Sequence, residues 1–234
     1  MPQSYLSPLE LMQRHIEALY THDENKRIVA VNQWDGGVAP RFFLGRTSVG
    51  NAWRFRADLP ADLASKLEYL CLEEPENLKQ EPRHKDKYIQ LLSAHLPIKQ
   101  VWQGPAYGCS KPVKPSPPFL QITEENAYLL RGGFEDWLLD VPHRQPFMAV
   151  LEDDHAVSIC SSVRITELAH EAGVETLTAY RRQGYAANVV AGWANTLLKK
   201  KIIPLYSTSW DNVASQKLAK KLGFSQFGTD FYIT

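Results

Sequence analysis

The order of helix-forming and strand-forming segments in the second half of the chain restricts the folds that it can adopt. Residues 147–151 and 156–164 favour two strands joined by a turn over 152–155. Single strands are expected later in the chain, over 170–178, 204–210 and 227–233. Helices are expected over 124–139, 185–201 and 212–222. A hairpin followed by strands that alternate with helices predicts an α+β fold, with a central mixed β-sheet flanked by helices.

The first half has its own helices and strands. Helices are predicted over 8–21, 58–72 and 87–95, and the first of these begins with Ser7 and Glu10 in the form of a capping box. Strands are expected over 27–31, 41–45 and 52–56. Residues 104–118 hold five prolines and two glycines, and proline removes backbone donors, so no regular element is expected there. We therefore predict two domains, an N-terminal α+β extension over 1–118 and a second domain over 119–234.

Composition excludes several classes of protein. Hydrophobic residues make up 44% of the 234 residues, enough for a core, and Lys+Arg and Asp+Glu are both 26. This balance argues against a nucleic-acid partner, because such proteins normally carry a basic excess. No apolar run reaches the ~18 residues of a membrane span, and the first eight residues lack the pattern of a signal peptide. No cysteines or histidines have the spacing of metal ligands, so we expect no metal. The three cysteines are scattered and odd in number, which suits a reducing compartment, so we expect a cytoplasmic chain.

The segment from Arg181 to Ala186 joins a predicted strand to a predicted helix, and it has the features of an anion site. Gly184 allows a bound group to approach the backbone closely, because it has no side chain. The first N–H groups of a helix have no partner inside the helix, and the helix dipole adds partial positive charge there. Arg181 and Arg182 add full charges. These features together suit a pyrophosphate.

The residues of this loop also admit other interpretations. Gly184 could form only a tight turn between solvated arginines, since short patterns of this kind recur by chance. A phosphate-binding Walker loop is excluded, because no Gly-Lys-Ser/Thr follows. A dinucleotide fingerprint is excluded as well, because its three-glycine spacing is absent.

At this loop the sequence resembles the GNAT superfamily of acyl-CoA-dependent N-acyltransferases. The family's signature, Gln/Arg-x-x-Gly-x-Gly/Ala, is met by Arg181, Gly184 and Ala186. The sequence also resembles a second family signature, in which an asparagine begins a helix that ends in Leu-Gly-Phe. Here Asn212 is the asparagine, and residues 222–224 are Leu-Gly-Phe. The resemblance covers about residues 119–234. It implies a GNAT-type sheet whose fourth and fifth strands splay apart, with the pantetheine arm of the cofactor between them.

The resemblance also implies which residues bind the cofactor, acetyl-CoA or another acyl-CoA. Leu177 and Thr178 would contact the pantetheine arm through their backbone. The pyrophosphate would lie against the loop and the start of the helix, at Arg181, Arg182, Gln183, Gly184, Tyr185, Ala186 and Ala187. Asn212 would lie near the arm, although asparagine is also a good helix N-cap. Ser215 is one turn further along the same helix.

The catalytic groups are less clearly indicated. An attacking ammonium must lose a proton, and family members often place a Glu or His for this purpose eleven residues before the signature. That position is His170, and a histidine with a pKa near 6.5 is a suitable base. Glu171 and Glu175 are competing candidates, because strand boundaries are uncertain by two or more residues. The opposing interpretation is that His170 is merely exposed at the start of a strand.

The sequence departs from the family's pattern at the position of the usual general acid. It is a tyrosine seven residues after the helix-opening Asn, and Ala219 occupies that position. Tyr180, Tyr206 and Ser215 are the alternatives that lie within reach. Cys160 is not expected to be a nucleophile, because no histidine and acid can be placed around it.

We therefore expect an N-acyltransferase that transfers acetyl from acetyl-CoA to a small-molecule amine or a peptide amine by direct attack in a ternary complex. The alternative is a non-catalytic acyl-CoA-binding sensor with the same fold, which the loss of the tyrosine favours. Residues 1–118 carry no chemical motif and are expected to lie on the acceptor side. No membrane partner is expected, and the sequence is compatible with a homodimer.

Overall fold

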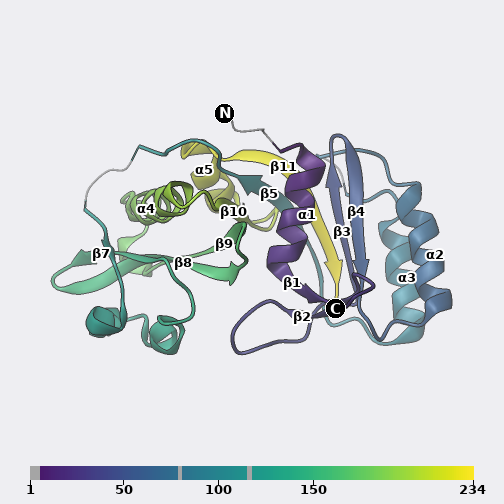
Figure 1. Cartoon of the computed structure of the whole chain (residues 1–234), viewed down its shortest axis with the longest axis horizontal. Helices are drawn as coiled ribbons and strands as arrows, with labels where there is room; N and C mark the ends of the chain where they lie inside the picture. The colour runs from purple at the N-terminus through teal and green to yellow at the C-terminus, as the bar shows by residue number, and fades with distance from the viewer. Residues whose placement is uncertain (1–5, 79–80, 115–117) are drawn as a thin grey trace. The chain divides into compact units, whose positions relative to one another are not determined.

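The computed structural model describes residues 6–78, 81–114 and 118–234. Residues 1–5, part of the N-terminal stretch considered above, and 115–117, part of the proline-rich segment, lie outside the described residues. The chain forms two compact units (Figure 1). The first contains residues 1–107, 207–213 and 226–234, and the second contains 108–206 and 214–225. This division differs from the expected boundary at 118/119, because two late segments of the chain belong to the first unit.

The first unit begins with helix α1 (Pro8–Leu19), which has the predicted capping box: Ser7 Oγ accepts from the Glu10 N–H, and the Glu10 carboxylate accepts from the Ser7 N–H. A small sheet of β1 (Tyr20–His22) and β2 (Ile28–Val31) follows. The remaining elements are β3 (Phe42–Thr47), β4 (Gly50–Phe55), α2 (Ala61–Leu72), α3 (Lys85–His95), β5 (Val101–Gly108) and β11 (Ser225–Ile233).

The sheet of the first unit runs in the order β4-β3-β11-β5. On one face Phe42, Leu44 and Phe231 pack against the apolar sides of α2 and α3. On the other face Met12 of α1 lies so close to Gly45 and Gly228 that a Cβ at either glycine would clash with it. Burial on both faces is why β3 is buried along its whole length.

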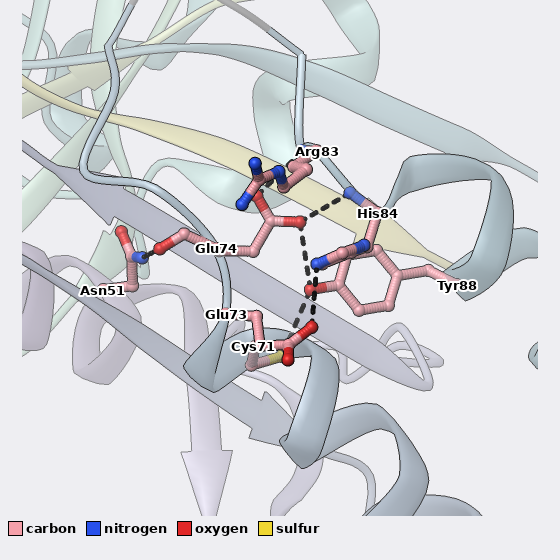
Figure 2. Close-up of polar contacts among 7 residues, drawn as sticks. All are labelled: Asn51, Cys71, Glu73, Glu74, Arg83, His84 and Tyr88. Carbon is pink, nitrogen blue, oxygen red and sulfur yellow. Dashed lines mark hydrogen bonds and ion pairs between the residues drawn. The ribbon is translucent and has the colours of Figure 1, made fainter.

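Figure 2 shows a buried polar network between α2 and α3. The Glu74 carboxylate accepts hydrogen bonds from the backbone N–H groups of Arg83 and His84, both at 2.8 Å, just before α3 begins. The Tyr88 hydroxyl donates to the same carboxylate at 3.2 Å, and Asn51 Nδ2 donates to the Glu74 backbone oxygen. Glu74 thus satisfies N–H groups at the start of a helix that has no side-chain cap.

The second unit holds a mixed sheet in the order β10-β9-β8-β7-β6. The hairpin predicted from the sequence is β7 (Phe147–Glu152) and β8 (His155–Ile165), and β9 (Ala169–Thr176) pairs antiparallel with β8. β10 (Ile203–Ser207) runs parallel to β9, and β6 (Leu120–Gln121) pairs with β7. Helix α4 (Tyr185–Lys199) covers one face of β7–β9 (Figure 1), and α5 (Val213–Lys221) follows β10. The predicted α+β class is confirmed.

Two predicted segments differ from the structure. The single helix expected over 124–139 is two 3-10 helices, Glu124–Leu130 and Glu135–Asp140, because Gly132 and Gly133 between them have φ angles of +97° and +149°. The region 104–118 was expected to be irregular throughout, yet its first residues belong to β5. Pro105 is accommodated there because the sheet uses its carbonyl, which accepts from the Thr208 N–H, and requires no donor from it.

Candidate functional site

The loop before α4 has the geometry of an anion cradle. Gly184 is the N-cap of α4, with a φ of +91°, and no side chain caps the helix. A Cβ built on Gly184 would have no atom within 4 Å, so the space above it is open. In the described part of the chain, the backbone N–H groups of Gly184, Tyr185 and Ala186 have no hydrogen-bond acceptor. These donors and the positive end of the helix dipole therefore face an open site.

The side chains of this loop hold its two ends. Arg181 Nε donates to the backbone oxygen of Thr176 at 3.1 Å, and Gln183 Nε2 donates to the backbone oxygen of Ala179 at 3.3 Å. The Tyr185 hydroxyl donates to the Glu152 carboxylate in the β7–β8 turn. Arg182 is exposed, with a φ of +64°. The loop is therefore held in a left-handed turn, and the charge of Arg182 remains available to a ligand.

A pocket of about 470 Å³ adjoins the cradle. Gln183, Gly184, Ala187 and Asn188 form one side of it, and the other sides come from 112–114 and from the end of α5 at 221–223. Lys114 and Lys221 both line it. Seven loop and helix positions from 181 to 187 were expected to bind the cofactor's phosphates, and three of these, Gln183, Gly184 and Ala187, line this pocket. The two lysines were not expected from the sequence.

Strands β9 and β10 pair over a short stretch only. Their register joins Ala169 to Ile203 and ends with Glu171 opposite Leu205, whereas β9 continues to Thr176. The Leu177 N–H donates to Val157 on β8 and its carbonyl accepts from Tyr180, so both backbone groups of Leu177 have partners. Because backbone groups alternate in direction along a strand, those of Val174 and Thr176 point away from β8, toward the side where β10 has diverged. Thr178 begins a 3-10 turn beyond the strand.

His170 is buried on the α4 face of the sheet, with 7% of its surface exposed. Its Nδ1 lies 2.8 Å from Ser162 Oγ, which also accepts from Trp193 Nε1 at 2.9 Å. The indole N–H can only donate, so the serine hydroxyl is free to donate to His170. Burial lowers the pKa of His170 to about 4, which keeps its imidazole neutral at physiological pH. The interpretation that His170 is exposed does not match this geometry.

The two acidic candidates lie in different surroundings. Glu171 is 4% exposed and is the last β9 residue paired with β10. Glu175 is exposed near the end of β9, and its carboxylate accepts from Trp137 Nε1 at 2.9 Å. Glu171 therefore lies where the two strands diverge, and Glu175 lies four residues further along β9, at the indole of Trp137.

Two of the candidate acids, Tyr206 and Ser215, lie on β10 and α5, and the third, Tyr180, ends the 3-10 turn after β9. The Tyr206 hydroxyl and Ser215 Oγ are 2.6 Å apart, and Tyr206 directly follows the last paired residue of β10. Ala219 is fully buried on α5. Asn212 precedes α5 and belongs to the first unit, whereas the loop and Ser215 belong to the second, so its place in the site stays a prediction.

In the described part of the chain, no three His, Cys, Asp or Glu side chains gather in a way that could hold a metal ion. None of the helices of the described residues has the length and apolarity that a membrane span requires. All three cysteines are free and buried.

The comparisons agree with this geometry. The GNAT acetyltransferase family model matches residues 147–230, which include the hairpin, the loop, α4 and α5. No curated protein matches the chain. This segment of the chain is similar to the GNAT acetyltransferase family. The resemblance stated from the two signatures is thereby confirmed.

Solved structures share the fold at low sequence identity. A GCN5-related N-acetyltransferase-like protein from Streptococcus suis is 16% identical, with a TM-score of 0.50, over 84% of this chain and 85% of that one. A protein from Drosophila is 14% identical, with a TM-score of 0.51, over 83% of this chain and 74% of that one. A GNAT-family acetyltransferase from Novosphingobium aromaticivorans is 16% identical, with a TM-score of 0.48, and this chain spans only 66% of its length. Because the first two matches cover more than four fifths of this chain, the shared fold extends well into the N-terminal half.

Proposed function

We propose that the chain is an N-acyltransferase that transfers the acetyl group of acetyl-CoA to an amine acceptor by direct attack in a ternary complex. The observation that carries this proposal is the left-handed Gly184 at the N-terminus of α4, with unpaired N–H groups facing an open pocket. A pyrophosphate carries the charge and the acceptor oxygens that such a cradle lacks. Arg182 supplies a full positive charge beside it.

The open side of β9 supports a place for the pantetheine arm. An extended, amide-bearing chain can form hydrogen bonds with a strand as an additional strand would. The outward backbone groups of Val174 and the Thr176 N–H are suited to this, whereas the Thr176 carbonyl already accepts from Arg181. Lys114 and Lys221 add positive charge in the pocket that adjoins the pyrophosphate loop.

The side chains around the divergence of β9 and β10 support two separate roles, a base for the amine and an acid for the leaving thiolate. The acyl thioester supplies an activated carbonyl carbon to the attacking amine. The amine must lose a proton, for which His170, Glu171 and Glu175 are the candidate bases, and Glu171 lies closest in register to the divergence. The leaving thiolate must be protonated, and the Tyr206 hydroxyl, with Ser215 beside it, replaces the tyrosine missing at Ala219.

The acceptor is proposed only by class, as a small amine or a peptide amine. The cytoplasm is the proposed location, and the N-terminal half is proposed to shape the acceptor side. A homodimer remains part of the proposal.

The experiment that tests the activity measures thiol release from acetyl-CoA across a panel of amines, amino acids and peptides, with mass spectrometry of the products. An enzyme gives acceptor-dependent release and an acetylated product. Single variants His170→Gln, Glu171→Gln and Glu175→Gln then identify the base: the pH profile of kcat/KM loses its acidic limb only in the variant that lacks it. If His170→Ala keeps full turnover from pH 6 to 9, His170 is not the base.

The second candidate function is an acyl-CoA sensor without catalysis. The observation that favours it is the buried Ala219 at the position of the family's acid. Binding of acetyl-CoA, observed by thermal shift, without thiol release for any acceptor would support the sensor and overturn the enzyme. If neither acetyl-CoA nor CoA stabilises the chain, both functions are excluded.

A further inference from the structure

The outer edge of β4, in the first unit, is an open strand edge. β4 is the terminal strand of its sheet and pairs with β3 only (Figure 1). The Arg56 N–H donates across this pair to Arg41, so backbone groups at alternate positions, those of Asn51, Trp53 and Phe55, point outward. Among the described residues, no strand pairs with these outward groups. The edge is closed just beyond Phe55, where the Ala57 N–H donates to the backbone oxygen of Ile28.

A groove of about 560 Å³ runs along this open edge. All five residues from Asn51 to Phe55 line it. On one side it is bordered by Gln13 of α1 and by the turn at 25–27, and on the other by α2, through Ala61, Ala64, Ser65 and Glu68. Five strand residues span about 17 Å, which is the length of a short extended peptide.

The groove carries an excess of positive charge. Lys26, Arg27 and Arg54 line it, against one carboxylate, Glu68. The Arg54 guanidinium donates to the Trp53 backbone oxygen and to Gln13 Oε1, both at 2.8 Å, and forms no ion pair in the described part of the chain. Arg27 donates to the Ala57 backbone oxygen, and Lys26 likewise has no carboxylate partner among the described residues. These three cations form no ion pair among the described residues, and Glu17 of α1, outside the lining of the groove, adds one electrostatic interaction with Arg54.

The two faces of β4 differ, which specifies the pattern of an added strand. Arg54 lies on the α1 face with Gln13, whereas Trp53 and Phe55 pack toward the core between the sheet and α2. Side chains of a strand alternate between faces. On an added strand, one set of side chains would therefore meet Arg54 and Lys26, and the other would meet the small residues of α2.

We propose that the β4 edge is a docking site for an extended acidic segment of another protein, which adds to the sheet as a strand. Its backbone groups would pair with the outward groups of Asn51, Trp53 and Phe55, and the Trp53 carbonyl, which already accepts from Arg54, would accept a second hydrogen bond. Its acidic side chains, at alternate positions, would face Arg54 and Lys26, and uncharged side chains would face Ala61 and Ala64. A second copy of this chain fits less well, because its own groove would bring the same excess of positive charge. This site is independent of the proposed acetyl transfer.

The test uses a labelled five-residue peptide of alternating aspartate and valine with blocked ends, and fluorescence anisotropy with the full chain. Two N-methylated forms, one methylated at odd and one at even positions, each remove the N–H groups of one edge of the peptide. Strand addition predicts that one form binds at least tenfold more weakly and the other nearly as well as the parent. Equal binding of both forms, or no binding of the parent peptide, would overturn the proposal.

Charge is tested by variants with a matched control. Arg54→Gln keeps a side chain that can reach Gln13, and it should weaken the acidic peptide at least fivefold. Arg14→Gln removes an exposed α1 arginine that pairs with Glu17 and does not line the groove, and it should leave binding unchanged. A lysine–valine peptide that binds as well as the aspartate peptide would contradict the proposal. So would a chain that dimerises at micromolar concentration through this edge and becomes monomeric in Arg54→Gln.

Discussion

His170 illustrates how much a single residue's role depends on burial. Its position in the sequence suggests a base with an ordinary pKa, but its side chain is buried, with Nδ1 hydrogen-bonded to Ser162 Oγ, which also accepts from Trp193. Burial disfavours the imidazolium, so the pKa of His170 is lowered to about 4. A group with this pKa is neutral at pH 7 and accepts a proton only when the reaction provides a strong driving force.

The lowered pKa predicts that stability depends on pH. The unfolded chain binds a proton at His170 below about pH 6.5, and the folded chain does so only near pH 4. The contribution of His170 is therefore fully present above pH 6.5 and is lost as the pH falls from about 6.5 to about 4, by at most about 3 kcal/mol. Urea unfolding between pH 4.5 and 7.5 should show this slope, and His170→Gln should flatten it. An equal slope in both proteins would place the pH dependence elsewhere.

Some residue-level features could be predicted from the sequence and others could not. A glycine at the start of a helix, after arginines, predicts the left-handed turn at Gly184, because few other residues adopt that conformation. The outward backbone groups of Val174 and Thr176 depend on the register of β9 against β8, which a sequence pattern does not determine. Lys221 could have been noted from its place directly before Leu222 and Gly223, but the pocket that it lines also needs residues 112–114, far away in the sequence.

At the scale of elements, the end of α5 faces the loop before α4 across one pocket. We predict that Lys221→Ala weakens the binding of acetyl-CoA by about threefold, the effect expected for a solvent-exposed charge pair. Binding of 3′-dephospho-CoA should be affected less, since it lacks the phosphate farthest from the thioester. Isothermal titration measures both ligands.

Lys220→Ala is the matched control for this prediction. Lys220 is on the same helix and exposed, but it does not line the pocket. If Lys220→Ala weakens acetyl-CoA as much as Lys221→Ala does, the lysine acts only through the general charge of α5.

The start of α3 gives a stability prediction. Glu74→Ala removes the acceptor of two backbone N–H groups and of the Tyr88 hydroxyl (Figure 2). Leaving these donors unsatisfied should lower the free energy of unfolding by about 2–3 kcal/mol. Glu73→Ala, the neighbouring control, breaks a 3.5 Å ion pair with His84 and a hydrogen bond with the exposed Tyr69, and should cost under about 1 kcal/mol. Chemical denaturation measures both, and equal losses would contradict the capping role of Glu74.

Elements with strong periodicity were predicted well, and elements that depend on particular turns were not. α1, with its capping box, and the β7–β8 hairpin were predicted to within a few residues. The helix expected over 124–139 failed because Gly132 and Gly133 interrupt it, a local signal that apolar spacing outweighed. The start of β1 was predicted as part of the first helix, because Tyr20 continues the apolar pattern of α1 although it belongs to the strand.

At the scale of the whole molecule, two sequence signatures and the order of the later elements indicated a resemblance to the GNAT superfamily, whereas the division into two units could not be predicted. The return of residues 226–234 to the first unit is a long-range pairing, in which β11 lies beside β3. Local patterns do not encode such pairings. The chain is therefore not a simple succession of an N-terminal and a C-terminal half.

The absence of an exposed thiol makes a kinetic prediction for the whole enzyme. All three cysteines are buried, and burial raises the pKa of the Cys71 thiol to about 12 and that of Cys160 well above its ordinary value. Direct attack predicts intersecting lines in double-reciprocal plots of initial velocity, and activity that survives treatment of the native protein with N-ethylmaleimide. Parallel lines, or inactivation that acetyl-CoA prevents, would indicate a covalent cysteine intermediate.

The central claim is that the loop before α4 binds the pyrophosphate of CoA, and isothermal titration of CoA into the native chain and two glycine variants tests it directly. Gly184→Val and Gly36→Val each place a side chain at a positive φ, +91° and +73°, with open space around the new Cβ, so both carry strain of about 1–2 kcal/mol. We predict that the native chain and Gly36→Val bind CoA alike, and that Gly184→Val binds at least tenfold more weakly. No binding by the native chain, or equal affinity in a folded Gly184→Val, would contradict the account.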